Sequence, residues 1–238
     1  MPGARNARGR LRGRMVCGAR GLRIDVHVPT GVGIVSPPVH VTPAPLRYLR
    51  EGLSGPEGCL ALRWYDDARE GCDVFAREHG LPLARVVTVL ALCSPRVSVG
   101  QSAVLARSVL TWGLDRTGGL LPCVRASLAR YLATGVVGAR PDRACKVRAF
   151  ASAILGDPDA VVVDVWVARG LGVVHAHLDG PRYRRAADVV RSLAGRVGVS
   201  PLVGQAALWY GVRRAAGHVG GVSRLRIDAP ALVQGDLF

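Results

Sequence analysis

From Ala44 to about residue 217, apolar residues recur every three or four positions, and glycine or proline interrupts each run. This spacing puts the apolar side chains on one face of a helix, so it predicts successive amphipathic α-helices. Alternating strand and helix patterns and a fixed internal repeat are absent, which argues against a parallel α/β sheet or a repeat fold. We therefore expect an all-α fold, with helices near 44–53, 60–79, 82–93, 98–113, 121–134, 141–155, 165–172, 181–197 and 201–217.

Several residues have the chemistry of helix ends. Helices are expected to start at Asp142, at Asp164 and at Ser200, which precedes a proline, because such side chains accept hydrogen bonds from free backbone amides. Glycine tolerates the left-handed conformation that closes many helices. Helix stops are therefore expected at Gly80, Gly113, Gly135 and Gly156. The run 160–163 is the one strand-like segment of the sequence.

The chain carries 32 basic and 17 acidic side chains, a formal charge of +15. This excess attracts polyanions, among which nucleic acid is the leading candidate. A membrane surface would attract the same charge, but no stretch approaches about 18 uninterrupted apolar residues. The N-terminus also lacks the apolar core of a signal peptide. We expect a cytoplasmic protein without a membrane partner, associated with the nucleoid or present in a phage-infected bacterial cell.

The two ends of the chain differ from the helical region. Residues 1–42 contain seven arginines before the first acid, Asp25, and then a stretch rich in Pro, Gly and Val. They are expected to form a flexible basic arm, and Met15 is an alternative start of the protein. Residues 219–238 are expected to form a C-terminal tail.

The cysteines and histidines do not predict a metal site. The six cysteines are scattered, and no two are close enough to form a CxxC motif, so free buried thiols are expected. His175 and His177 form an HxH pair, but no cysteine or third histidine lies at ligand spacing around them. We therefore expect no metal and no other cofactor.

One basic residue differs in kind from the others. The chain has 31 arginines and a single lysine, Lys146. Arginine can replace lysine wherever only positive charge is needed, but it cannot lose its proton in a protein. A lysine amine can lose its proton, attack carbon and form a Schiff base. Lys146 is therefore a candidate nucleophile, although a single lysine can also remain by chance.

A second candidate lies 18 residues further on. Asp164 follows four apolar residues and precedes the expected helix 165–172. A carboxylate after such a run is costly to bury unless it caps a helix or meets a cation. Capping alone would explain Asp164, and pairing with Lys146 is the functional alternative.

The segment KVRAFASAILGDPDAVVVDVWVAR, which runs from Lys146 to Arg169, resembles the helix-hairpin-helix (HhH-GPD) DNA glycosylases of the endonuclease III type. In that family a lysine opens the second hairpin helix, and an aspartate follows an apolar run. LALCSPRVSVGQSAVLA, residues 90–106, is similar to the family's Leu-Leu-Ser-Ala-Gln segment beside the DNA. The resemblance spans roughly residues 60–217. It implies a two-lobed helical fold with the active site in the cleft between the lobes.

The sequence departs from this family at the hairpin. The family's Leu-Pro-Gly-Val-Gly, whose glycines let backbone amides approach a phosphate, is replaced by residues 139–145. No cysteine follows Cys145, so the family's iron-sulfur cluster is not expected. The pattern looks closer to a divergent branch of the family that is associated with phage genomes and bulky modified bases.

The resemblance implies a glycosylase that flips a modified base, such as an enlarged pyrimidine, out of double-stranded DNA and leaves an abasic site, in phage defence or phage DNA metabolism. Asp164 would stabilise the positive charge on the sugar. Either water or Lys146 would attack, and attack by Lys146 could also nick the strand. No protein partner is implied, and a monomer is expected. One lobe would span 82–155, and the other would combine 43–81 with 156–218.

The resemblance also implies two sets of binding residues. Residues expected to stack on the base, fill its place or line its pocket are Trp166, Arg96, Gln101, Gln205, Trp209 and Tyr210. Residues expected to contact DNA phosphates are Arg140, Arg143, Arg148, Arg169, Arg182, Arg184, Arg185, Arg213 and Arg214. Ordinary core packing remains the alternative for Trp209 and Tyr210.

Two other functions remain open. An enzyme of the same fold could build or edit hypermodified thymine bases in phage DNA. A noncatalytic helical protein could bind DNA, with Lys146 contacting only phosphate.

Overall fold

A computed structural model of the chain describes residues 43–54, 58–138, 145–173, 178, 180–218 and 227. All of them belong to one unit of the chain, Ser36–Phe238. They form nine helices and no strand. The helices are α1 (Pro43–Ser54), α2 (Gly58–Glu78), α3 (Leu83–Cys93), α4 (Val99–Trp112), α5 (Pro122–Thr134), α6 (Cys145–Leu155), α7 (Val165–Gly170), α8 (Gly180–Val197) and α9 (Pro201–Ala215). The all-α prediction is therefore confirmed for this part of the chain.

Most helix ends lie where the sequence places them. Ser200 caps α9 by accepting a hydrogen bond from the backbone amide of Val203, and Asp164 caps α7. Gly135 ends α5 in the left-handed conformation, with φ 71°. Helix α6 begins at Cys145, four residues after the expected start at 141, and Asp142 lies outside the described residues.

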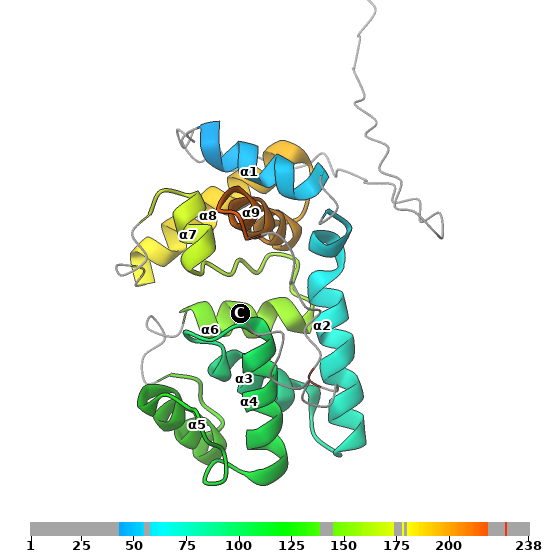
Figure 1. The fold of residues 1–238 in the computed structure, drawn as a ribbon, viewed down its shortest axis with the longest axis vertical. Helices are drawn as coiled ribbons and strands as arrows, with labels where there is room; N and C mark the ends of the chain where they lie inside the picture. The colour runs from blue at the N-terminus through cyan, green and yellow to red at the C-terminus, as the bar shows by residue number, and fades with distance from the viewer. Residues whose placement is uncertain are drawn as a thin grey trace, which may run out of the picture. The chain divides into compact units, whose positions relative to one another are not determined.

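Two sets of helices pack mainly within themselves (Figure 1). Helices α4, α5 and α6 pack on α3, whereas α1, α7 and α8 pack on α9. Helix α2 contacts members of both sets. Each set surrounds one central helix, α3 or α9, whose buried apolar side chains belong to a single core cluster. The two central helices therefore fix the positions of the others.

Helix α9 packs closely on α1 and α8 because glycines lie at the contacts between these helices. A Cβ atom on Gly211 would collide with the carbonyl oxygen of Tyr48 in α1, and one on Gly52 would collide with the carbonyl oxygen of Ala207 in α9. A Cβ on Gly204 would overlap the side chain of Ala194 in α8. These contacts need residues without side chains, and they fix the position of α9 against α1 and α8.

The strand-like run 160–163 is extended and buried, but it pairs with no other strand among the described residues. A single hydroxyl on α8 replaces the missing sheet partner. Tyr183 Oη accepts from the amide of Val163 at 3.0 Å and donates to the carbonyl oxygen of Val161 at 2.9 Å. Two of the buried backbone groups are satisfied in this way, which helps the segment to lead to Asp164 without a sheet.

One cysteine corrects the expectation of free buried thiols. Cys59 is exposed and disulfide-bonded. Cys72 and Cys93 are buried, and Cys123 is exposed. Spacing alone did not predict a disulfide, because Cys59 belongs to no CxxC or similar local motif.

Some expectations fall outside the described residues, namely the basic arm 1–42, the hairpin region 139–144, His175 and His177. In the expected tail 219–238, only Ile227 is described, and it is buried. Among the described helices, none combines the length and apolar character needed to cross a membrane.

Candidate active site

A pocket of about 640 Å³ opens among α2, α4, α6, α7 and α9. Its volume lies in the range of ligand sites, roughly 300–1,000 Å³. Aromatic and apolar side chains dominate the lining. Four charged residues also face the pocket, namely Arg96, Lys146, Asp164 and Arg213. Three basic side chains and one carboxylate therefore line the same pocket.

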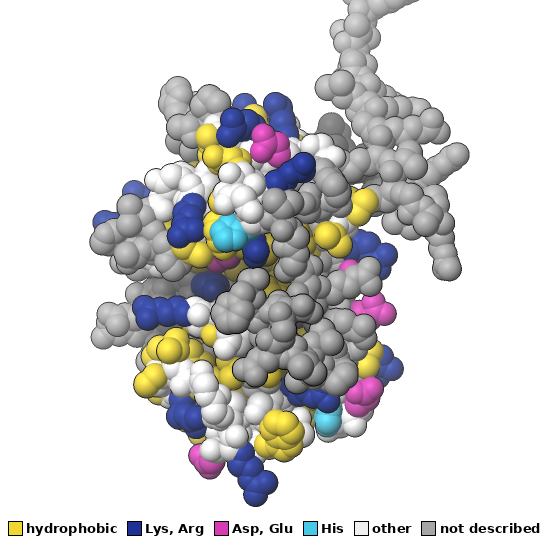
Figure 2. All heavy atoms as spheres, viewed as in Figure 1, with side chains coloured by type: hydrophobic (Ala, Val, Ile, Leu, Met, Phe, Trp, Pro, Cys, Tyr) yellow, Lys and Arg dark blue, Asp and Glu magenta, His cyan; other side chains and the backbone are white. Residues whose placement is uncertain are grey.

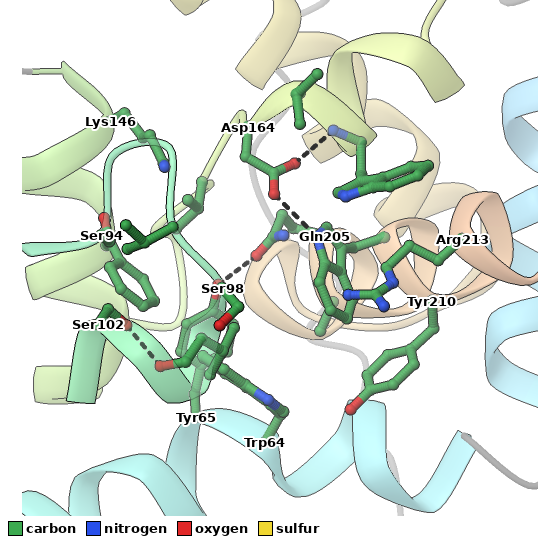
Figure 3. Close-up of a pocket in the computed structure, with 18 of the residues that line it drawn as sticks. Trp64, Tyr65, Ser94, Ser98, Ser102, Lys146, Asp164, Gln205, Tyr210 and Arg213 are labelled. Carbon is green, nitrogen blue, oxygen red and sulfur yellow. Dashed lines mark hydrogen bonds between the residues drawn. The ribbon is translucent and has the colours of Figure 1, made fainter. Parts of the chain in front are cut away.

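Asp164 is fixed at the entrance to α7 by three hydrogen bonds (Figure 3). Its Oδ1 accepts from the backbone amides of Trp166 and Val167 at 3.0 and 2.9 Å. Its Oδ2 accepts from Trp209 Nε1 at 2.8 Å. Capping and a pocket-facing role therefore coexist, because each oxygen can accept more than one hydrogen bond.

Lys146 reaches the same pocket from the first turn of α6. Within the part of the chain that the structure describes, its amine makes no hydrogen bond or ion pair, and the ion pairs found there join other residues. Burial lowers the pKa of Lys146 below 10.5, its usual value, and the Asp164 carboxylate partly opposes that shift. The amine is therefore easier to deprotonate than a surface lysine.

One face of α9 supplies three pocket residues at four-residue spacing: Gln205, Trp209 and Arg213. Residues four apart lie above one another on a helix. Trp209 holds Asp164, and Arg213 lies over the Trp209 ring, 4.6 Å from its centroid. The same guanidinium lies 5.7 Å from the centroid of Trp166.

Arg213 thus contacts both indole rings that flank Asp164. Its Nε is buried and has no hydrogen-bond partner among the described residues. Burial lowers the pKa of Arg213, and Asp164 and Tyr210 oppose that change. The contacts with the two rings are favourable cation–π interactions. Arg213, expected at DNA phosphates, therefore lines the pocket and contacts the aromatic residues around the carboxylate.

The connection between α3 and α4 forms the opposite part of the lining. Arg96 has φ 61°, and it is the one described residue other than glycine with positive φ. This conformation is uncommon for a residue with a side chain and is concentrated at functional sites. Ser98 caps α4 by accepting from the amide of Gln101. The side chain of Arg96 is exposed at the pocket, whereas Gln101 is exposed outside its lining.

The remaining expected residues are not gathered at one place. Trp166 and Tyr210 line the pocket. Arg169 contacts the Trp166 ring at 4.7 Å, and Arg148 donates to the carbonyl oxygen of Val137. Arg182, Arg184, Arg185 and Arg214 are exposed on α8 and α9. Arg140 and Arg143 lie outside the described residues. Figure 2 shows described basic side chains spread over the viewed face rather than gathered in one patch.

Sequence reasoning missed the part of the pocket formed by α2 and α6. Trp64, Tyr65 and Phe150 line it, and the rings of Trp64 and Phe150 are stacked with centroids 6.0 Å apart. Phe150 was detectable, because it lies four residues after Lys146 and so shares its helix face. Trp64 and Tyr65 gave no such signal, and the contact of Tyr65 with Gln205 in α9 joins residues 140 positions apart.

The site brings together a fixed carboxylate, an amine with a lowered pKa and several aromatic rings. A planar ligand could stack on the rings, the carboxylate could stabilise a developing positive charge, and the amine could act as a base or nucleophile. These are properties of the described side chains, whichever ligand the pocket takes.

Comparisons with known proteins identify a family. A model of a family of unknown function, DUF7178, matches residues 60–216. Neither the curated proteins nor the solved structures gave a match. The matched range contains every residue that lines the pocket. The chain therefore belongs to the family of unknown function DUF7178.

Proposed function

We propose that this protein is a DNA glycosylase of the helix-hairpin-helix type. The observation that carries the proposal is that Lys146 and Asp164 face one pocket of a size suited to a flipped nucleotide. The order of the elements supports it: a connection with strained Arg96, then Lys146 at the start of α6, then Asp164 at the start of α7. The helices around α3 and those around α9 would form the two lobes, with DNA across the seam.

The reaction breaks the bond between C1′ of the sugar and the base nitrogen. As the bond lengthens, positive charge develops on the sugar, and Asp164 stabilises it electrostatically. Water then adds to C1′ and loses a proton, the base leaves with a proton, and an abasic site remains. Two amides and an indole hold the carboxylate in place, so little reorganisation is needed during the reaction.

Lys146 supplies the alternative nucleophile. If its neutral amine attacks C1′, the base leaves and the sugar ring opens to an imine, which can proceed to strand cleavage. Burial favours the neutral amine by lowering its pKa. Excision by water is the simpler route and the one we propose. Trapping the imine with borohydride distinguishes the two.

The exposed arginines suit DNA as the partner. Arg182, Arg184 and Arg185 lie together on α8, and the chain carries a charge of +15. Such side chains neutralise phosphates without reading the sequence of bases. Specificity would then come from the pocket.

A screen for released bases tests the proposal. Duplexes carrying single plain, damaged or enlarged pyrimidines and purines are incubated with the protein, and free bases are measured by mass spectrometry. Release from at least one substrate is expected, and Asp164→Asn should slow that release by on the order of 1,000-fold. Absence of release and of any borohydride adduct, combined with tight DNA binding, would support a noncatalytic DNA-binding protein instead.

A further inference from the structure

Gln205 is a buried amide that faces the pocket with only one end paired. Its side chain is 4% exposed, and its Oε1 accepts a hydrogen bond from the Tyr65 hydroxyl at 2.5 Å. Its Nε2 has no hydrogen-bond partner among the described residues. Figure 3 shows the amide between Tyr65 and Asp164, with its bond to Tyr65 dashed.

The contact with Tyr65 determines which end of the amide faces the ligand. An amide can turn over, because one end accepts and the other donates. In the turned orientation Nε2 would donate to Tyr65, and the buried hydroxyl proton would lose the one acceptor it has among the described residues. Burial, with a smaller effect of Asp164, raises the pKa of Tyr65 well above its usual value, so the hydroxyl keeps this proton at neutral pH. Gln205 is therefore held with its N–H groups toward the pocket.

The other polar groups of the pocket differ in what they offer. Lys146, Arg96 and Arg213 offer donors, and the neutral form of Lys146 also offers one lone pair as an acceptor. Ser94 and Ser102 donate their protons to the carbonyl oxygens of Ala91 and Val99, so their lone pairs remain as acceptors. Both serines belong to the side built from the α3–α4 connection and α4. On the side built from α9, Gln205 offers a donor.

We propose that Gln205, oriented by Tyr65, reads a carbonyl oxygen on the flipped base, so that the pocket selects a base with a keto group over one with an amino group at that position. The inference rests on the proposed function, because it assigns a substrate class to the same site. Gln205 contacts the base, whereas Tyr65 acts through Gln205 as a positioning residue. Uracil and thymine fit this pattern, because each has a 4-keto oxygen that can accept a hydrogen bond from Gln205 Nε2. Cytosine does not fit, because its 4-amino group is itself a donor and would face the donor of Gln205.

Binding of bulged DNA tests the inference without any need for catalysis. The probes are two duplexes that differ only in one unpaired nucleotide, dU or dC, and the protein is the full chain carrying Asp164→Asn, in which any base release should be too slow to alter the probe during the measurement. We expect about 10-fold tighter binding of the dU bulge, the effect of about one hydrogen bond. Equal affinities for the two probes would overturn the inference.

Two substitutions in this background test the two roles separately. Gln205→Glu replaces the donor by an acceptor while Tyr65 still donates to the other oxygen, so the preference should reverse toward dC. Tyr65→Phe lets the Gln205 amide turn over, so the preference should fall to about two-fold or less with both affinities measurable. Tyr131→Phe, on α5 and outside the pocket lining, is the matched control and should keep the full preference.

The result separates this inference from the proposed function. Release of a base without a keto preference, or with a preference unchanged by Gln205→Glu, would reject the inference and leave the glycosylase intact. A dU preference that changes with Gln205→Glu and Tyr65→Phe as expected, combined with no base release by the parent protein, would reject the glycosylase. It would leave a binding pocket that selects keto groups. Circular dichroism of each variant checks its folding, and a folded protein with no affinity for either bulge would overturn both.

Discussion

Asp164 and Lys146 line the same pocket but are held in opposite ways. The carboxylate at the start of α7 accepts three hydrogen bonds, whereas the amine at the start of α6 makes none among the described residues. A preorganised charge suits stabilisation of a transition state, and an unpaired amine can move toward a bound substrate. The difference indicates that the two groups have separate roles and need separate tests.

The largest effect is expected from exchanging the carboxylate. Asp164→Asn keeps the shape and removes the charge, so base release should fall by on the order of 1,000-fold, comparable to the loss of a preorganised electrostatic group. Lys146→Gln should reduce release by only about 100-fold if water is the nucleophile, which is the lower end of the contribution of an acid–base group. Single-turnover rates on one duplex measure both. Equal losses of base release in the two variants would indicate that Lys146 is the nucleophile. The two groups would then not differ in importance as their hydrogen bonding suggests.

The next effect concerns the indole that holds the carboxylate. Trp209→Phe removes the hydrogen bond to Asp164 Oδ2, and a bond to a charged group contributes about 1.5–3 kcal/mol. Base release should slow by about 10–100-fold. Trp166→Phe is the matched control, because Trp166 bonds Asp164 through its backbone amide, and it should lose much less. A larger loss of base release in Trp166→Phe than in Trp209→Phe would mean that stacking by the Trp166 ring matters more than the hydrogen bond between Trp209 and Asp164.

The pH dependence of imine formation sharpens the comparison of the two charges. The neutral amine is the attacking form, and the pKa of Lys146 lies below 10.5. Borohydride trapping on DNA with a preformed abasic site should therefore rise with pH, with a midpoint below 10.5. Asp164 stabilises the ammonium form, so Asp164→Asn should move the midpoint to lower pH. A midpoint that stays or rises would mean that the carboxylate does not act on the amine.

A smaller effect is expected at Arg213, which stacks on both indoles. Arg213→Lys keeps the charge but loses the planar group, and cation–π contacts contribute about 0.5–2 kcal/mol. Base release should slow by about 3–30-fold. Arg214→Lys, at the exposed neighbour, should leave the rate unchanged. Equal behaviour of the two variants would remove Arg213 from the support of the site.

The smallest effect on the rate is expected at the exposed arginines of α8. Replacing Arg182, Arg184 and Arg185 by Gln removes charge outside the pocket lining. The slope of log affinity against log salt should become shallower by about 0.9 for each phosphate that these arginines neutralise in the parent protein. Single-turnover release at saturating protein should stay within about two-fold of the parent, as expected for surface residues away from the reacting groups. An unchanged slope would place the DNA on another surface.

The sequence was sufficient for the helices and for the two reactive groups of the site, and it also indicated five of the residues that line the pocket, namely Arg96, Trp166, Gln205, Trp209 and Tyr210. Apolar spacing and end residues such as Ser200 and Gly135 act locally, so they could be read without a structure. Lys146 was distinctive by its rarity and Asp164 by its position after an apolar run. The orientation of Gln205 and the contacts of Arg213 could not be predicted, because they depend on side chains brought together by α2, α7 and α9.

The close crossing of α1 and α9 has a consequence for redesign. Gly52 and Gly211 let the two backbones touch, and α1 contributes no side chain to the pocket. One side of α9 therefore packs on α1 and fixes the position of the helix. The other side carries Gln205, Trp209 and Arg213. Libraries aimed at new substrates can vary Gln205 on the latter side, provided that both glycines and the two supports of Asp164, Trp209 and Arg213, are left as they are.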